Sequence, residues 1–211
     1  MEVYNTRFFT YDDESSNRVL LKIPNEWWSR LYEYHWAAQF ADENDVCLDA
    51  ACGVLHPYKF FLASKCRDVY GCDLGNLERN NVINEMRYYF DDNDINLAMN
   101  YFNNINLRNY NLIALGYEDN KFDKVYCISV LEHLNKTDIK KALNEIYRVL
   151  KDKGLFILTV DYPSIDLNDL IADIAEIGFK FKGSIKTEKP ANAIYSPLFG
   201  GLNCFRILVE K

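Results

Sequence analysis

The sequence predicts an α/β protein in which helices cover both faces of a mainly parallel sheet. From Val46 to Lys211, strand-like runs alternate with segments of helical periodicity. The runs are short or continuously apolar, which is typical of strands that are buried on both faces. The expected strands are Val46–Ala50, Val69–Cys72, Val125–Ser129, Leu155–Val160 and, as the last one, Cys204–Glu210.

Helices are expected between these strands. Apolar residues recur at helical spacing over Ile139–Leu150, with Thr137 available as the N-cap. A second helix with one apolar face begins near Ser164 or Asp166 and stops at Gly178. It joins two of the last strands.

The first forty residues are less regular. Residues 1–22 are predicted to form a polar, hairpin-forming arm, in which Phe8–Tyr11 and Val19–Ile23 flank the turn-rich Asp12–Asn17. Asn25–Phe40 is predicted to be a helix. Because this helix is apolar on more than one face, we expect it to lie deep or to cover a ligand.

Length and composition limit the class of protein. The 211 residues fit one domain, with residues 1–45 as an N-terminal arm and cap helix and 46–211 as the core. The Asn- and Asp-rich stretch 76–109 is expected to hold one or two helices. A net charge of −7 argues against a nucleic-acid partner. The six cysteines form no C-x-x-C pair and are interpreted as reduced, buried residues.

No segment is basic and apolar enough for a signal peptide, and none is long enough to cross a bilayer. We therefore expect a cytoplasmic protein that does not bind a membrane. The sequence leaves the oligomeric state undetermined.

The segment Val46–Tyr58 combines a strand, a tight turn and a helix start, the place where open α/β sheets bind nucleotides. Gly53 allows main-chain atoms to approach a ligand closely, and Asp49 ends the strand facing the cleft. The next strand ends at Asp73, whose carboxylate can accept both hydroxyls of a ribose. The spacing of these residues predicts an adenosine-binding site.

Three motifs occur in the order found in class I S-adenosylmethionine-dependent methyltransferases, and the chain resembles that family. They are Leu48–Gly53, Val69–Asp73 and Phe122–Leu134. The resemblance implies a Rossmann-like three-layer sandwich whose seven-stranded, mostly parallel sheet has an antiparallel last strand. It also implies S-adenosylmethionine as cofactor and S-adenosylhomocysteine as product.

The resemblance also implies which residues bind the cofactor. Residues of the first loop would lie at the methionine moiety, Asp73 at the ribose and Leu74 against the adenine. The predicted cofactor-binding set is Asp49, Ala51, Cys52, Gly53, Asp73, Leu74, Asn111, Leu112 and Ser129. The loop departs from the family pattern, because Ala51 and Leu55 stand where many members have glycine.

Methyl transfer from a sulfonium requires alignment of the reactants and no metal. His133 or Glu132 is predicted to assist deprotonation of a hydroxyl or amine of a small-molecule acceptor. A helix-start cap is the alternative for His133. Trp28, Tyr32 and His56 are predicted to bind the acceptor, with core packing or an exposed loop as the alternatives. Short resemblances at His56-Pro57 and Glu33–Trp36 suggest a glycan- or lipid-related acceptor.

Two other functions remain open. An NAD-dependent oxidoreductase would need a G-x-G-x-x-G fingerprint before the first helix, and the sequence lacks it. A non-catalytic, regulatory S-adenosylmethionine-binding protein is compatible with the substituted glycines.

Overall fold

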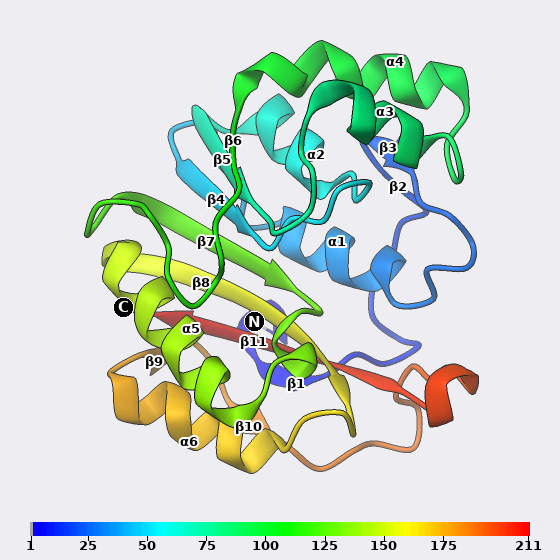
Figure 1. The fold of residues 1–211 in the computed structure, drawn as a ribbon. Coiled ribbons are helices and arrows are strands. Elements are labelled where there is room, and N and C mark those ends of the chain that lie inside the picture. Colours follow the sequence, from blue (N-terminus) through cyan, green and yellow to red (C-terminus); the bar gives the residue numbers. More distant parts are fainter. Residues whose placement is uncertain (1) are drawn as a thin grey trace.

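A computed structural model describes residues 2–211 of the chain. Its centre is a nine-stranded sheet in the order β10-β1-β11-β8-β7-β4-β5-β6, with β9 paired to β11 (Figure 1). The strands from β4 to β8 are parallel, and β11 runs antiparallel to β8. The long strands are β4 (Val46–Ala50), β5 (Asp68–Cys72), β6 (Ile105–Arg108), β7 (Phe122–Ile128), β8 (Leu150–Tyr162) and β11 (Asn203–Glu210).

This architecture confirms the predicted Rossmann-like α/β fold with an antiparallel last strand. The sheet has nine strands because short segments extend its edge beside β11. These segments are β1 (Thr6–Phe8), β9 (Lys180–Phe181) and β10 (Ile185–Lys186). No helix in the described part of the chain is long and apolar enough to cross a membrane.

Helices cover both faces of the sheet (Figure 1). Alternate residues of β8 point to opposite faces: Phe156 and Leu158 pack with α5 and α6, whereas Ile157 packs on the side of α1 and α2. The α-helices are α1 (Arg30–Ala38), α2 (Tyr58–Lys65), α3 (Arg79–Met86), α4 (Asp92–Tyr101), α5 (Lys136–Val149) and α6 (Leu167–Ile177). Single 3₁₀ turns occur at Glu2–Tyr4, Phe102–Asn104, Leu131–His133 and Leu198–Gly200.

The ends of the helices follow local capping chemistry. Asp166 caps α6 and Gly178, with φ of 114°, ends it, as predicted. The N-cap of α5 is Asn135 and not the predicted Thr137, because the Asn135 side chain accepts the backbone N–H of Asp138. The helix predicted over Asn25–Phe40 is shorter, since α1 begins only at Arg30.

The predicted hairpin between Phe8–Tyr11 and Val19–Ile23 is wrong. β1 instead pairs antiparallel with β11 in the main sheet. Only β2 (Arg18–Val19) and β3 (Leu21–Lys22) form a small hairpin of their own. The physical reason is burial: Phe8 and Phe9 enter the cores on opposite faces of the sheet, which a solvated hairpin would not achieve.

Candidate active site

Polar side chains gather at the carboxyl ends of the parallel strands. Asp49 lies near the end of β4, Asp73 follows β5, Ser129 follows β7 and Asp161 lies near the end of β8. Two adjoining cavities open there, with volumes of about 300 Å³ and about 570 Å³. Arg30, His56 and His133 line both of them. The two cavities could therefore hold two small molecules side by side, one in each.

Two first-loop residues that line the smaller cavity have left-handed backbone conformations. Ala51 has φ of 55° and Gly53 φ of 61°, both in the left-handed region that favours glycine. Ser129, with φ of 50°, turns the chain in the same way after β7. The smaller cavity is lined by Arg30, Tyr34, Asp49, Ala51, Cys52, Gly53, His56, Tyr58, Asp73, Ile128, Ser129, Val130 and His133.

Asp73 organises the loops around the smaller cavity. Its carboxylate accepts the backbone N–H of Gly53 at 2.9 Å and that of Gly75 at 2.8 Å. The Asn109 amide, which follows β6, donates to the backbone oxygens of Asp73 and Gly75. Asp73 thus joins the loops that follow β4 and β5, while its carboxylate still borders the cavity.

Lys59, in the first turn of α2, fixes the backbone of the loop that follows β4. Its fully buried ammonium donates to the backbone oxygens of Gly53 at 2.7 Å, Val54 at 3.0 Å and His56 at 2.5 Å. Burial lowers the pKa of Lys59, and the acidic groups of Cys52, Asp49 and Asp73 oppose that shift. These bonds fix the loop although it lacks the glycines at positions 51 and 55.

Asp49 is a buried carboxyl group that lacks a partner. It is only 4% exposed, and its Oδ2 makes no hydrogen bond to any residue in the range 2–211. Burial, reinforced by the nearby Asp73, raises its pKa to about 7 against the opposing effect of Lys59. A ligand ammonium group would supply the missing partner, so the site fits the amino group of S-adenosylmethionine.

Arg30 was not predicted as a site residue. Its guanidinium is paired with the fully buried Glu33 and donates to the Ser129 hydroxyl at 3.0 Å. Glu33 in turn accepts from the hydroxyls of Ser129, at 2.7 Å, and Thr159. Burial alone would raise the pKa of Glu33, but Arg30 and these hydroxyls lower it. The network fixes α1 over the ends of β7 and β8.

The larger cavity contains two of the three predicted acceptor-binding residues, Trp28 and His56. Tyr32 does not line this cavity, and its ring lies 6.4 Å from that of Phe9, so its role in acceptor binding stays a prediction. Burial, with Arg30 and Lys59 nearby, lowers the pKa of His56 to about 3, so its imidazole is neutral. The lining is Glu26, Trp27, Trp28, Ser29, Arg30, His56, Tyr89, Glu132, His133, Asp161, Ser164, Leu198 and Leu202.

The two predicted bases differ in their surroundings. His133 is exposed at the junction of the cavities. Glu132 accepts the backbone N–H of Asp161 through Oε1 at 3.0 Å. Burial, with the charge of Asp161, raises the pKa of Glu132 to about 8. Asp161 itself was missed, although it lies at a strand end as Asp49 does, and burial raises its pKa to about 7.

Three predicted cofactor residues lie outside the lining of the smaller cavity. Leu74 is 68% exposed beside Asp73, and Leu112 is buried. The Asn111 side chain accepts the backbone N–H of Ile113. Cys52 does line the cavity, but burial raises its thiol pKa well above the ordinary value, which favours a packing role.

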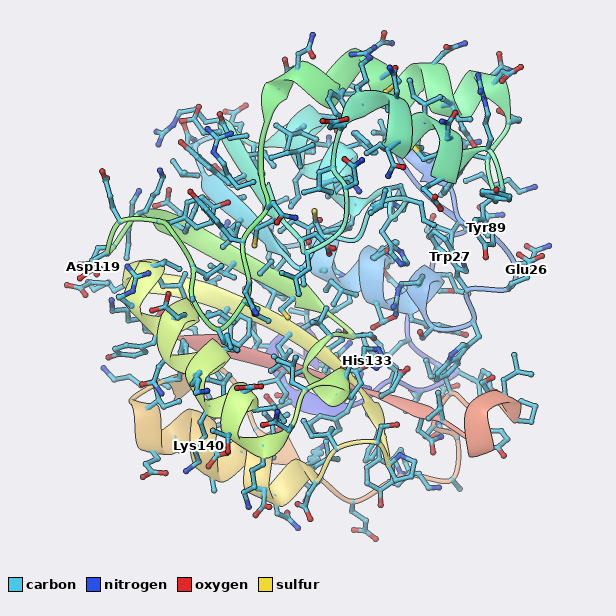
Figure 2. All side chains as sticks on the ribbon, viewed as in Figure 1. Glu26, Trp27, Tyr89, Asp119, His133 and Lys140 are labelled. Atoms are coloured by element: carbon cyan, nitrogen blue, oxygen red, sulfur yellow. The ribbon has the colours of Figure 1, made fainter. Side chains whose placement is uncertain are left out.

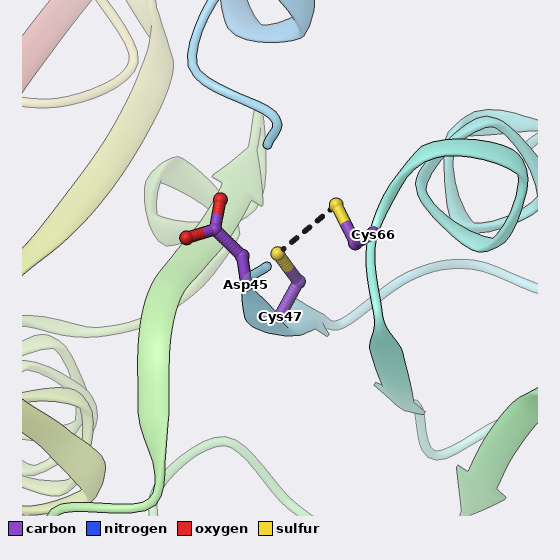
Figure 3. Close-up of side chains that lie close together, drawn as sticks. All are labelled: Asp45, Cys47 and Cys66. Atoms are coloured by element: carbon purple, nitrogen blue, oxygen red, sulfur yellow. Dashed lines mark hydrogen bonds between the residues drawn. The ribbon is translucent and has the colours of Figure 1, made fainter. Parts of the chain in front are cut away.

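A cluster of residues of the types that can bind metals lies at the amino end of β4, opposite the end that borders the cavities. Figure 3 shows its members, Asp45, Cys47 and Cys66. Asp45, Cys47 and Cys66 bring their donor atoms within 4.8 Å of one another, and the two sulfurs are 3.3 Å apart. The Asp45 carboxylate already pairs with the Lys124 ammonium. Three donors with a nearby cation make a poor metal site, and independence from metals stays a prediction.

A parallel sheet with cavities at the carboxyl ends of its strands is typical of α/β folds that bind nucleotides. A match to a family model narrows this assignment to one family. Residues 48–158, slightly more than half of the chain, match the model described as "Methyltransferase domain". The chain therefore belongs to the S-adenosylmethionine-dependent methyltransferase family, which confirms the resemblance predicted from its motifs and the predicted cofactor.

Curated relatives match only parts of the chain. An uncharacterized protein of Methanocaldococcus jannaschii is 45% identical over 64 residues, which cover 30% of this chain and 27% of that protein. Sterol 24-C-methyltransferase of Saccharomyces cerevisiae is 30% identical over 113 residues, covering 53% of this chain and 26% of that enzyme. The chain spans about a quarter of the length of these relatives.

Solved structures support the fold over most of the chain. A TehB-like S-adenosylmethionine-dependent methyltransferase from Corynebacterium glutamicum has a TM-score of 0.58 at 17% identity and covers 85% of this chain and 86% of its own. The cyclase SpnF has a TM-score of 0.64 at 12% identity, with 98% and 86% covered. At such identities the likeness establishes the fold alone.

Proposed function

We propose that this protein transfers a methyl group from S-adenosylmethionine to a hydroxyl or amine of a small-molecule acceptor. The observation that carries the proposal is the pair of adjoining cavities, which share Arg30, His56 and His133 as common walls. The smaller one contains the family's first-loop residues, and the larger one offers room for an acceptor beside them.

The chain's own residues have distinct roles in this proposal. S-adenosylmethionine, when bound, supplies a methyl group that its sulfonium already activates. The Asp49 carboxylate would hold the cofactor's amino group, and the Arg30 guanidinium its carboxylate. The remaining lone pairs of Asp73 are available for ribose hydroxyls. Asn111 and Leu112 are proposed to border the adenine beyond Leu74.

A base is needed when the acceptor atom carries a proton that it must lose. Glu132, with its raised pKa and its place in the larger cavity, is the better candidate for this role. His133 is the second candidate, since it lies at the junction of the cavities. A glycan- or lipid-related acceptor and a cytoplasmic location stay predictions.

Isothermal titration calorimetry with S-adenosylmethionine, S-adenosylhomocysteine and NAD tests the cofactor assignment. We expect both sulfur compounds to bind, NAD not to bind, and Asp49→Asn to weaken binding about 10-fold through loss of one charged contact. Asp169→Asn, at an exposed pair with Lys136, is the matched control. Preferential binding of NAD would contradict the proposal.

Turnover with labelled S-adenosylmethionine and a panel of small hydroxyl and amine compounds tests the activity. Transfer of label to an acceptor is the expected result. Tight cofactor binding with no transfer to any acceptor would favour the regulatory alternative.

A further inference from the structure

The larger cavity has aromatic walls. The Trp27 ring lies 5.4 Å from that of Tyr89 and 4.5 Å from the His56 ring, measured between centroids. Figure 2 shows Glu26, Trp27 and Tyr89 close together on one side of the molecule, and Trp28 completes this part of the lining. The faces of tryptophan and tyrosine rings carry negative partial charge and attract cations.

Carboxyl groups outnumber cations in the same lining. Glu26, Glu132 and Asp161 border the cavity, whereas the Arg30 guanidinium is paired with Glu33 and, in the proposed complex, also with the carboxylate of the cofactor. His56 is neutral, because its pKa lies near 3. The raised pKa values of Glu132, about 8, and Asp161, about 7, leave these groups partly protonated in the empty cavity, and a nearby cation would stabilise their ionised forms. The chamber therefore favours a positively charged occupant over a neutral or anionic one.

Two of these carboxyl groups lack hydrogen-bond partners. Glu132 Oε2 and Asp161 Oδ1 are buried and make no hydrogen bond within the described part of the chain. Leaving such an oxygen unsatisfied is costly, so buried polar atoms normally find a partner. An ammonium group of a ligand carries several N–H donors and could satisfy both oxygens, whereas a hydroxyl group donates only one hydrogen bond.

We propose that the larger cavity binds an acceptor through a protonated amine, held by Glu132 and Asp161 and flanked by Trp27, Trp28 and Tyr89. This inference rests on the proposed methyltransferase function and specifies its acceptor. In the transfer, an N–H proton passes to a Glu132 or Asp161 carboxylate oxygen, and the freed lone pair bonds to the methyl carbon. The electron pair of the broken carbon–sulfur bond stays on sulfur.

The test compares three probes of similar size and different charge on the wild-type chain: 2-phenylethylamine, 2-phenylethanol and phenylacetate. Binding is followed by calorimetry and by tryptophan fluorescence, because Trp27 and Trp28 line the cavity. We expect the amine to bind at least about 10-fold more tightly than the alcohol, and phenylacetate to bind weakest. Equal or tighter binding of the alcohol or of phenylacetate would overturn the proposal.

Variants then locate the binding site. Glu132→Gln and Asp161→Asn should each weaken amine binding about 10-fold, because the amide keeps the side-chain shape but cannot ionise to pair with the bound cation. Glu14→Gln, whose carboxylate is 87% exposed on the surface, should leave amine binding unchanged. Unchanged amine binding in both cavity variants would also overturn the proposal.

Titration with S-adenosylmethionine distinguishes failure of the proposed amine acceptor from failure of the proposed methyltransferase function. Cofactor binding without a preference for the amine would refute only the acceptor class. Absence of S-adenosylmethionine binding to the wild-type chain would refute the proposed methyltransferase function itself.

Discussion

The conformation of the loop that follows β4 depends on Gly53. Gly53 has φ of +61°, and a Cβ atom placed there would lie 2.5 Å from Cδ2 of His56. His56 in turn separates the two cavities and is held by the Tyr34 hydroxyl at 3.1 Å. A change at Gly53 would therefore disturb both chambers through one imidazole.

Gly53→Ala is expected to weaken S-adenosylmethionine binding by about 10-fold or more, since it adds the left-handed strain of about 1 kcal/mol to a steric clash. Calorimetry measures the change. Gly200→Ala is the control, because Gly200 also has a positive φ, of +87°, but a Cβ atom placed there would have no neighbour within 4 Å. Similar affinities in the two variants would show that the clash with His56 has no effect.

Lys59→Met is expected to lower the free energy of unfolding by about 3 kcal/mol, because it removes the donor of three backbone oxygens in the cofactor loop. Cofactor affinity should fall with it. Urea unfolding gives the stability. The control is Lys65→Met, which changes an exposed lysine of the same helix and should have an effect below about 0.5 kcal/mol. Equal stability of the two variants would contradict this account of Lys59.

Among the elements, α1 shows how a short helix is fixed over a sheet. Its nine residues place Arg30 and Glu33 against the ends of β7 and β8, where Ser129 and Thr159 supply hydroxyl groups. A helix of this length is marginal by itself, so its position depends on these contacts and on the burial of Tyr34 and Trp36.

Glu33→Gln is expected to destabilise the protein by about 3 kcal/mol, because it leaves the mostly buried Arg30 charge without its partner. Chemical denaturation is the measurement. The same substitution at Glu14, which pairs with His35 of α1 at the surface, should cost less than about 0.5 kcal/mol. A loss below about 1 kcal/mol at Glu33 would mean that α1 is held by its apolar contacts alone.

Site residues could be predicted from the sequence where their spacing along the chain is typical of a known kind of site. Asp49, Asp73 and Gly53 were predicted because their spacing along a strand, a tight turn and the next strand is that of a nucleotide-binding loop, and because they fall in motifs of the methyltransferase family. Lys59 was missed, since a lysine in a helix normally lies in solvent and only three-dimensional contact reveals its buried carbonyl partners. Tyr32 lies outside the cavity lining, because α1 directs its ring toward Phe9, and sequence periodicity alone does not specify which neighbour a helix face meets.

For the whole molecule, the buried acids predict how stability depends on pH. The pKa is raised to about 7 in Asp49 and Asp161 and to about 8 in Glu132, above their ordinary values of 3.8 and 4.5. Between these values the folded state binds more protons than the unfolded state, so stability falls as pH rises. Acids with lowered pKa, such as Asp13 and Asp123, act oppositely in the acidic range.

His56, whose pKa is lowered to about 3, opposes this trend below its ordinary value of 6.5. We therefore expect the urea midpoint to fall between about pH 6.5 and pH 9, with a total loss on the order of a few kcal/mol. Glu132→Gln should flatten this profile, because its amide cannot titrate. A midpoint that rises over this range, or a Glu132→Gln profile as steep as that of the wild type, would contradict the assignment of the buried acids.

The pairing of β1 with β11 has a consequence for biosynthesis. These strands lie near opposite ends of the chain, yet Arg7 is opposite Arg206 and Phe8 opposite Phe205 in the sheet. Phe9 can pack against Trp36 of α1 early, but until the ribosome has released β11, Phe8 lacks its neighbour Phe205, and the growing chain carries it as an apolar side chain open to chaperones. Such a long-range pairing is slow to form. Completion of this edge of the sheet therefore awaits the synthesis of β11.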